Sequence, residues 1–190
     1  MKSELKIQKL KKKDIKIAKK FTSNLVGEGI YTKSTIKKAI KSKKHHFQIL
    51  KLNGECVGYH YYAFAKQKAI PKILGNTKPS TAFESCQSDE KLAIFCSIGI
   101  LPEYRNRGIS DFAITEAISH AKSENCTMLV AYAWQKGNKA PAENPLKRHG
   151  FQLFETVENA WQDIENLKCT VCGKEKCECT AKIFTKRIEK

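Results

Sequence analysis

The sequence predicts an α/β fold in which helices and strands alternate along a chain of 190 residues. Two observations indicate this class. Residues 46–66 contain two β-rich runs around a turn dipeptide, and two uniformly apolar runs, residues 92–101 and 126–134, flank a segment of helical period. A right-handed crossover through that helix should make the two apolar strands parallel. The length suits one sizeable core with a small appendage rather than two full domains.

The first quarter of the chain predicts a short strand followed by two amphipathic helices. Residues 5–7 alternate between apolar and polar side chains, as in a half-buried strand. Asp14 is expected to cap the first helix, which runs to Leu25, because its carboxylate can accept the free N–H groups of the first turn. Thr32 or Ser34 should cap the second helix in the same way.

Two segments break the periodicity. Residues 25–33 place Gly27 and Gly29 around Glu28. They form either a mobile recognition loop or a plain connection between the helices, and the plain connection is favoured. Residues 67–90 show no sustained period and predict a long loop. Loops of this length are functional lids, interface segments or insertions, and the sequence leaves all three open.

The remaining elements follow from turn chemistry and apolar runs. Asn53-Gly54 favours a type I′ turn at the centre of the hairpin. The strands at 92–101 and 126–134 are expected to be buried on both faces. A short helix and two further strands complete the series, at residues 141–148, 152–157 and 181–188.

A turn suited to a bound phosphate lies between strand 92–101 and the next helix, in the stretch SIGILPEYRNRGIS. Backbone N–H groups at the start of a helix lack intrahelical acceptors, and the helix dipole adds positive potential there. Gly108 has no Cβ to block an approaching anion, and Arg105 and Arg107 add charge. The alternative is an ordinary strand-to-helix turn with two solvated arginines.

The positive charge of the chain is concentrated near its N-terminus. The net charge is +16, and residues 1–51 hold sixteen lysines against three acidic residues. A surface of this kind attracts nucleic acid, acidic proteins or phosphorylated cofactors. Only four of the 35 basic residues are Arg, the usual choice for planar recognition of phosphates and bases. Nucleic-acid binding is therefore kept as an alternative and is not favoured.

The order of elements and two motifs resemble the GNAT N-acetyltransferase superfamily. RNRGIS, residues 105–110, resembles the family signature [RQ]-x-x-G-x-[GA] for acetyl-CoA, and KRHGF, residues 147–151, resembles its Gly-Phe segment. The resemblance covers residues 1–158 and 180–188. It implies a mixed, mostly antiparallel central sheet with flanking helices, and the chain is expected to be a single GNAT-like domain spanning residues 1–190.

The resemblance also implies a site and a reaction. Backbone amides from Asn106 to Ser110 would hold the pyrophosphate of acetyl-CoA, and the strand edge from Ile98 to Ile100 would pair with its pantetheine arm. A primary amine of a small molecule or protein would attack the thioester directly, without a covalent enzyme intermediate. The implied coenzyme-binding residues are Ile98, Gly99, Ile100, Arg105, Asn106, Arg107, Gly108, Ile109 and Ser110.

The sequence departs from the family pattern at two points. Ser110 ends the signature where the family has Gly or Ala, and Leu146 replaces the tyrosine that many members use to protonate the leaving thiolate. The general acid and base are therefore not identified. Weak candidates for the base are His60, Glu90 and Tyr132, with a structural role as the default for His60.

A second chemical feature is a cluster of four cysteines in LKCTVCGKEKCEC, namely Cys169, Cys172, Cys177 and Cys179. Four thiolates at this spacing can surround a tetrahedral Zn²⁺, and Gly173 permits the tight turn. Free thiols, a redox pair or iron are the alternatives. The cluster falls in an insertion at residues 159–180 between the last two strands. The resemblance implies that this connection borders the acceptor site, so the metal would stiffen a loop facing the acceptor.

Two further expectations concern partners and location. No apolar run approaches the roughly 20 residues of a membrane span, and the start of the chain lacks the apolar region of a signal peptide, so a cytoplasmic protein without membrane attachment is expected. It should act as a monomer or homodimer. The alternative to an acetyltransferase is a nucleic-acid or ribosome-associated binding module that uses the zinc knuckle and the Lys-rich surface.

Overall fold

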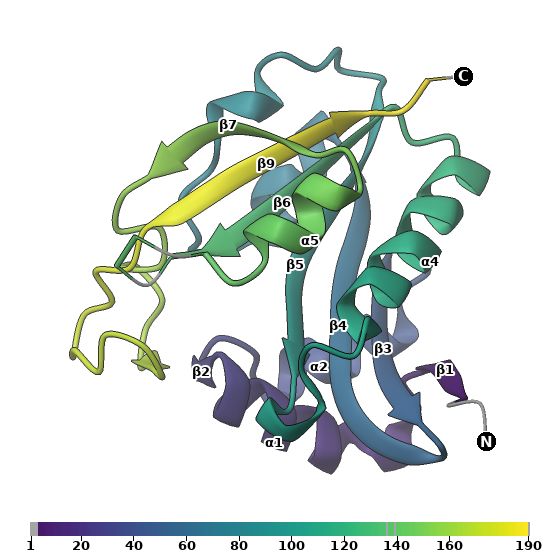
Figure 1. Ribbon diagram of the computed structural model, residues 1–190. Coiled ribbons are helices and arrows are strands. Elements are labelled where there is room, and N and C mark those ends of the chain that lie inside the picture. Colours follow the sequence, from purple (N-terminus) through teal and green to yellow (C-terminus); the bar gives the residue numbers. More distant parts are fainter. Residues whose placement is uncertain (1–3, 136, 139, 190) are drawn as a thin grey trace.

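The computed structural model describes residues 4–135, 137–138 and 140–189. They form a seven-stranded sheet in the order β1-β3-β4-β5-β6-β9-β7, with helices on both faces (Figure 1). Neighbouring strands are antiparallel except β5 and β6, which are parallel as predicted from the crossover. The mixed, mostly antiparallel sheet expected from the sequence is therefore confirmed.

The strands of this sheet are β1 (Leu5–Lys9), β3 (His45–Leu52), β4 (Glu55–Lys66), β5 (Lys91–Ile100), β6 (Met128–Trp134), β7 (Gln152–Val157) and β9 (Ala181–Arg187). A second, two-stranded sheet pairs β2 (Gly27–Glu28) with β8 (Lys168–Cys169). The helices are α1 (Ile15–Leu25), α2 (Lys33–Lys41), α3 (Ile70–Leu74), α4 (Ile109–Ser123) and α5 (Glu143–Arg148). Short 3₁₀ turns occupy Lys12–Asp14, Gln67–Ala69, Thr81–Phe83 and Pro102–Tyr104.

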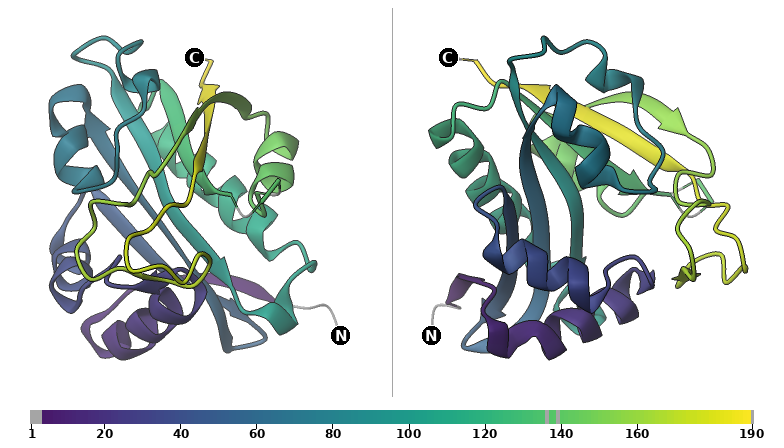
Figure 2. Two further views of the ribbon diagram at one scale, coloured as in Figure 1. Left: turned by 90° about the vertical axis from the view of Figure 1, so that its left-hand side faces the viewer. Right: turned by 180° about the vertical axis from the view of Figure 1, so that it is seen from behind.

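The helices divide between the two faces of the sheet. Helices α4 and α5 cover one face, and α1 and α2 lie on the other (Figures 1 and 2). Ile114 and Ala117 of α4 pack with Phe95 of β5. Ala18 of α1 and Ile36 of α2 pack on the opposite face. Both faces of the central strands are therefore buried.

The predicted turn and one of the two predicted caps are confirmed. Asn53 and Gly54 both have positive φ, at 50° and 86°, as a type I′ turn requires. The hydroxyl of Thr32 accepts the N–H of Thr35 at 3.1 Å and so caps α2. The cap predicted at Asp14 is wrong, because its carboxylate accepts the N–H of Lys11, 3.0 Å away, and closes the preceding 3₁₀ turn.

The segment at 67–90 is not a bare loop. It contains α3 and two 3₁₀ turns, and it buries Ile70 and Phe83 against the sheet. Glu155 of β7 accepts the backbone N–H of Thr81 at 2.8 Å and the hydroxyl of Ser80. These elements have at most five residues, so they are too short to show a hydrophobic period from which they could be predicted.

Strands β5 and β6 separate halfway along their length, as Figure 1 shows. They pair from Leu92 to Phe95 and diverge beyond that point. A β-bulge accompanies the separation: on β4, Tyr62 pairs with Phe95 and Tyr61 with Ser97, so Cys96 is the extra residue. A bulge bends the strand that carries it. The expected burial of strand 92–101 on both faces therefore holds for Leu92 to Phe95, whereas Cys96 to Ile98 are half-buried.

No helix in the part of the chain that the structure describes is both long enough and apolar enough to cross a membrane.

Candidate functional site

The turn between β5 and α4 presents free backbone N–H groups. Asn106 and Gly108 adopt left-handed conformations, with φ of 59° and 73°. Within the described residues, no backbone carbonyl accepts the N–H groups of residues 106–110. A Cβ added to Gly108 would meet no atom within 4 Å, so the space beside the turn is open and glycine is required by its φ. The turn has the features of an anion site.

The two arginines of the turn are held by their neighbours. Arg105 donates from Nε to the carbonyl of Ile100 at 3.1 Å, which ties the turn to the end of β5. The Arg107 guanidinium lies 5.3 Å from the centre of the Tyr104 ring. Tyr104 in turn donates its hydroxyl to Glu55 at 2.7 Å. Both arginines remain exposed, so their charge is available to a ligand.

Helix α5 braces the first turn of α4. Arg148 makes two hydrogen bonds to the Asp111 carboxylate, Nε to Oδ1 at 2.9 Å and Nη2 to Oδ2 at 2.8 Å. These bonds lower the pKa of Asp111. The pair neutralises a carboxylate that would otherwise oppose an anion at the turn. Phe151 anchors the same segment by packing against Phe95.

The last part of β5 offers an open edge at the separation from β6. Ile98, Gly99 and Ile100 pair with β4 on one side, and their other edge faces the separation. A Cβ on Gly99 would lie 2.7 Å from the ring of Tyr59 and 3.0 Å from Leu25 of α1. Glycine at this position therefore allows α1 to pack against the strand.

The structure separates the three candidate bases. His60 is 1% exposed between the rings of Tyr62 and Phe95, and burial lowers its pKa to about 3. Glu90 precedes the opposite end of β5, where it contacts Arg187 at 3.0 Å. Tyr132 is the first β6 residue beyond the paired segment, and it donates its hydroxyl to the carbonyl of Lys78 at 3.2 Å. Of the three, Tyr132 alone borders the separation.

Two polar contacts at the bulge were not predicted from the sequence. Tyr31 donates its hydroxyl to the carbonyl of Cys96 at 3.4 Å, and the hydroxyls of Tyr59 and Ser97 lie 2.5 Å apart. Burial raises the pKa of Tyr31 and of Tyr132 well above the usual value, so both hydroxyls are neutral and can donate. The contact of Tyr31 with β5 joins residues 65 positions apart, so local sequence patterns cannot predict it. The only hint in the sequence is that Tyr31 follows the two glycines at 27 and 29.

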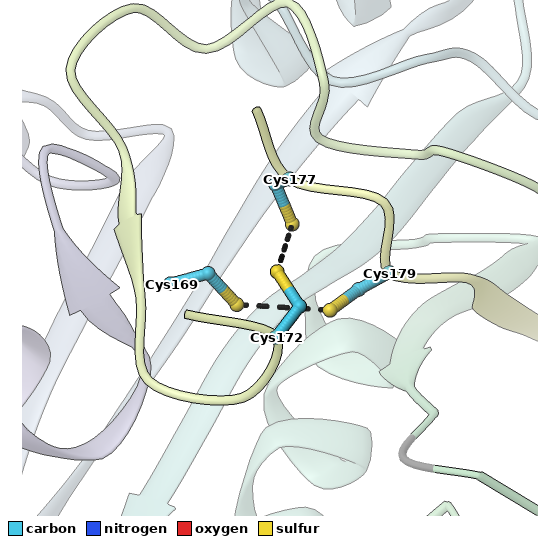
Figure 3. Close-up of side chains that lie close together, drawn as sticks. All are labelled: Cys169, Cys172, Cys177 and Cys179. Atoms are coloured by element: carbon cyan, nitrogen blue, oxygen red, sulfur yellow. Dashed lines mark hydrogen bonds between the residues drawn. The ribbon is translucent and has the colours of Figure 1, made fainter. Parts of the chain in front are cut away.

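The four cysteines of the C-terminal loop converge (Figure 3). Sγ of Cys169 lies 3.7 Å from that of Cys179, and Sγ of Cys172 lies 4.0 Å from that of Cys177, with all four within 4.8 Å of one another. A tetrahedron with Zn–S distances of about 2.3 Å has S–S edges of about 3.8 Å. Gly173, with φ of 62°, makes the expected turn. This cluster has the ligands and spacing to hold a metal.

The cysteines differ in their protonation. Burial raises the pKa of the Cys172 thiol, but hydrogen bonds from the backbone of Lys174 and Glu178 outweigh it and bring the pKa to about 7. Burial raises the pKa of Cys179 to about 11. A bound divalent cation favours the thiolates and would remove the penalty of burying them.

The cysteine loop is attached to the connection between α1 and α2. Gly27 pairs with Cys169 and Glu28 with Lys168, so residues 25–33 are not the plain connection favoured from the sequence. A Cβ on Gly27 would lie 2.7 Å from the carbonyl of Lys168, and one on Gly29 would lie 2.5 Å from that of Asn166. Both glycines are therefore required for the close approach of the two segments.

Apolar side chains continue this contact toward β6. Ile30, Trp134 and Trp161 pack against the cysteine cluster, and Trp134 ends β6 beyond the separation. The cysteine loop thus joins the α1–α2 connection to the diverging end of β6, beside the bulge.

Comparison with known families agrees with this geometry. Residues 17–151 match the model of the acetyltransferase (GNAT) family. The chain belongs to this family. The match ends at Phe151, so the cysteine cluster lies outside it. No curated protein matches the sequence.

Solved GNAT structures share the fold at low sequence identity. Arabidopsis thaliana NAA60 in complex with a bisubstrate analogue has a TM-score of 0.73 and 14% identity, covering 98% of this chain and 100% of that one. Arabidopsis thaliana Naa50 with the bisubstrate analogue CoA-Ac-MVNAL has a TM-score of 0.67 and 16% identity, with coverages of 97% and 99%. An agmatine N-acetyltransferase mutant has a TM-score of 0.66 and 10% identity, with coverages of 97% and 100%.

The pairing of Asp111 with Arg148 predicts a pH-dependent contribution to stability. Asp111→Asn should lower the melting temperature by about 2–4 °C at pH 7, corresponding to about 1 kcal/mol for a partly exposed pair. Because the pKa of Asp111 is lowered in the folded state, the stabilisation is present above the unfolded pKa and is lost as pH falls through the folded value. In thermal scans, the melting temperatures of variant and wild type should therefore converge as the pH falls below the ordinary aspartate pKa of about 3.9.

Asp89→Asn is the matched control, since Asp89 is exposed and makes no ion pair among the described residues. An equal effect of the two substitutions at pH 7 would contradict a specific role for the Asp111–Arg148 pair.

Proposed function

We propose that this protein is an acetyl-CoA-dependent N-acetyltransferase that transfers the acetyl group to a primary amine of a small molecule or protein. The observation that carries the proposal is the succession of two features along one stretch of the chain, from β5 to the start of α4. The free N–H groups of residues 106–110 follow the open β5 edge at Ile98 to Ile100 after a short 3₁₀ turn. A diphosphate and an amide-containing arm, joined as in acetyl-CoA, match this order of groups.

Each part of the coenzyme has a proposed partner. The amides of residues 106–110, with Arg105 and Arg107, bind the pyrophosphate. The pantetheine amides pair with the free edge of Ile98 to Ile100, in the position that β6 would occupy if it did not diverge from β5. Ser110 is half-buried in the first turn of α4 and replaces the usual Gly or Ala of the signature. Acetyl-CoA bound to NAA60 supports this assignment at the level of the fold.

The proposed reaction is a direct transfer. The amine nitrogen forms a bond to the acetyl carbon, the carbon–sulfur bond breaks, and the amine loses a proton while the thiolate gains one. Holding both reactants at the bulge supplies the main rate enhancement. The hydroxyls of Tyr31 and Tyr132 stay protonated and can donate hydrogen bonds, but their raised pKa values make them poor acids. Water therefore takes the proton from the amine and supplies one to the thiolate.

His60 is assigned a structural role in this scheme, because burial keeps it neutral and excludes solvent from it. Glu90 is excluded by its place before the far end of β5, which is roughly 30 Å from Ile100 along an extended strand of ten residues.

The acceptor is proposed to enter between the α1–α2 connection and the cysteine loop. Tyr31 reaches the bulge from the first segment, and Trp134 and Trp161 lie beside the second. NAA60 and Naa50 were solved with bisubstrate analogues, and the agmatine enzyme is named for a small amine. The fold therefore accommodates both classes of acceptor.

A structural Zn²⁺ is proposed for the four cysteines, because their spacing fits a ZnS₄ tetrahedron and no fifth ligand is needed. The metal would hold the loop in a form that pairs with β2. In this proposal residues 1–190 form one catalytic domain. Residues 159–180 are an insertion that forms one side of the acceptor site, opposite the α1–α2 connection.

Replacing Gly108 tests the coenzyme site. Gly108→Ala should raise the Kd for acetyl-CoA in calorimetric titration by about 5- to 30-fold. A left-handed conformation costs a non-glycine residue about 1–2 kcal/mol, so the turn should shift away from the conformation that binds the coenzyme. Gly75→Ala is the matched control: Gly75 also has positive φ and open space, and it lies after α3. Equal acetyl-CoA affinity in the two variants, or no binding to the wild type, would contradict the proposal.

Removing one cysteine tests the metal. The wild type should contain one Zn²⁺ per chain by elemental analysis. Cys172→Ser should lose it and lower the melting temperature by about 4–8 °C, equivalent to about 2 kcal/mol. Residues 25–33 should then exchange amide hydrogens faster, while the Kd for acetyl-CoA stays within about twofold.

The control for this experiment is Cys56→Ser, a cysteine outside the cluster. Unchanged metal content in Cys172→Ser, or unchanged exchange in residues 25–33 despite metal loss, would refute the stiffening role.

A further inference from the structure

Residues 9–44, which include α1 and α2, carry most of the net positive charge of the molecule. Thirteen lysines between residues 9 and 44 are all exposed, and Asp14 and Glu28 are the only acidic residues in that range. Within the described residues none of these lysines forms an ion pair, and Glu28 pairs with Lys168 instead. Residues 52–190 carry a net charge of only +3. The charge is therefore a local property of this surface.

Four of these lysines line a groove formed by α1 and the first residue of α2. A surface hollow of about 410 Å³ is lined by Lys16, Lys19 and Lys20 of α1, Lys33 of α2, and the side chains of Ile15 and Ser23. We call these four lysines the lysine groove. The two helices lie on the outside of the sheet, as the right-hand view of Figure 2 shows.

This arrangement costs stability in the isolated protein. Lys16 and Lys20 are four residues apart on α1, and like charges at this spacing destabilise a helix by a few tenths of a kcal/mol. Lys33, Lys37 and Lys41 repeat the pattern on α2. A polyanion would remove this repulsion, so the surface is complementary to one.

The side chains that line the groove favour one class of polyanion over the others. Interfacial membrane binding requires bulky apolar side chains on the basic face, but the large hydrophobic residues exposed in the described structure are Leu153 and Phe154 of β7. Single-stranded nucleic acid is bound on aromatic platforms, and no aromatic residue lines the groove. Lysine ammonium groups contact phosphate oxygens, and contacts to phosphate carry no sequence information.

We propose that the lysine groove binds the phosphate backbone of double-stranded nucleic acid, independently of base sequence and of whether the duplex is RNA or DNA. The proposal is separate from acetyl transfer, because the groove residues take no part in the coenzyme site. It also gives the N-terminal lysines a role that the acetyltransferase site does not require.

The test is a fluorescence-anisotropy titration of the full chain with a labelled 20-base-pair duplex, as RNA and as DNA, between 50 and 200 mM salt. Four neutralised phosphates predict a slope of log K against log salt of about −3.6, or about 150-fold weaker binding over that range. The two duplexes should bind within about threefold of each other. A salt slope shallower than about −1, between −1 and 0, would overturn the proposal, and so would binding of the RNA duplex alone.

Charge reversal locates the surface. The triple variant Lys16→Glu, Lys19→Glu, Lys20→Glu should bind at least about tenfold more weakly at 50 mM salt, with a slope near −1. The control is Lys66→Glu, Lys68→Glu, Lys122→Glu, which changes the net charge equally with exposed lysines outside the groove. An equal loss in both triple variants would mean a bulk charge effect and would refute the groove.

Two additional measurements keep the test decisive. Replacing Lys16, Lys19 and Lys20 with Gln removes the charge without adding a negative one, and it should reduce the slope even if the Glu variant fails to fold. Vesicles of phosphatidylserine and phosphatidylcholine form the second arm. Tight vesicle binding without duplex binding would contradict the proposal in favour of a membrane surface.

Discussion

The separation of β5 from β6 is the constraint on which the rest of the site depends. A parallel pair normally satisfies the edges of both strands, but here pairing stops after Phe95 because Cys96 forms a bulge against β4. The free edge of β5 and the turn before α4 then follow one another along the chain. Buried contacts hold the strand in this bent form: Tyr59 and Leu25 pack against Gly99, and Tyr31 reaches the carbonyl of Cys96.

The second constraint is the attachment of the cysteine loop to the α1–α2 connection. Two short strands, joined at glycines that no larger residue could replace, link segments about 140 residues apart. A pair of two-residue strands is too small to be stable alone. In the proposed function, a metal held by the four clustered thiols would supply the missing rigidity. The proposed acceptor site would then depend on an element outside the region that the family model matches.

The sequence predicted local features well and distant contacts poorly. The type I′ turn at Asn53-Gly54, the seven main strands and the cysteine cluster depend on residues close in the chain, and all are found in the structure. The pairing of Gly27 with Cys169 and the contact of Tyr31 with Cys96 could not be predicted, because no periodicity encodes which loops meet. Asp14 failed as a cap because a 3₁₀ turn preceded the helix and used its carboxylate.

The most direct test of the acetyl-CoA site is amide hydrogen exchange of the whole protein with and without acetyl-CoA. Binding should slow exchange in two stretches, the free edge from Ile98 to Ile100 and the turn from Asn106 to Ser110, because both gain hydrogen-bond partners on the coenzyme. Unchanged exchange in both stretches at saturating acetyl-CoA, or protection confined to other parts of the chain, would contradict the account.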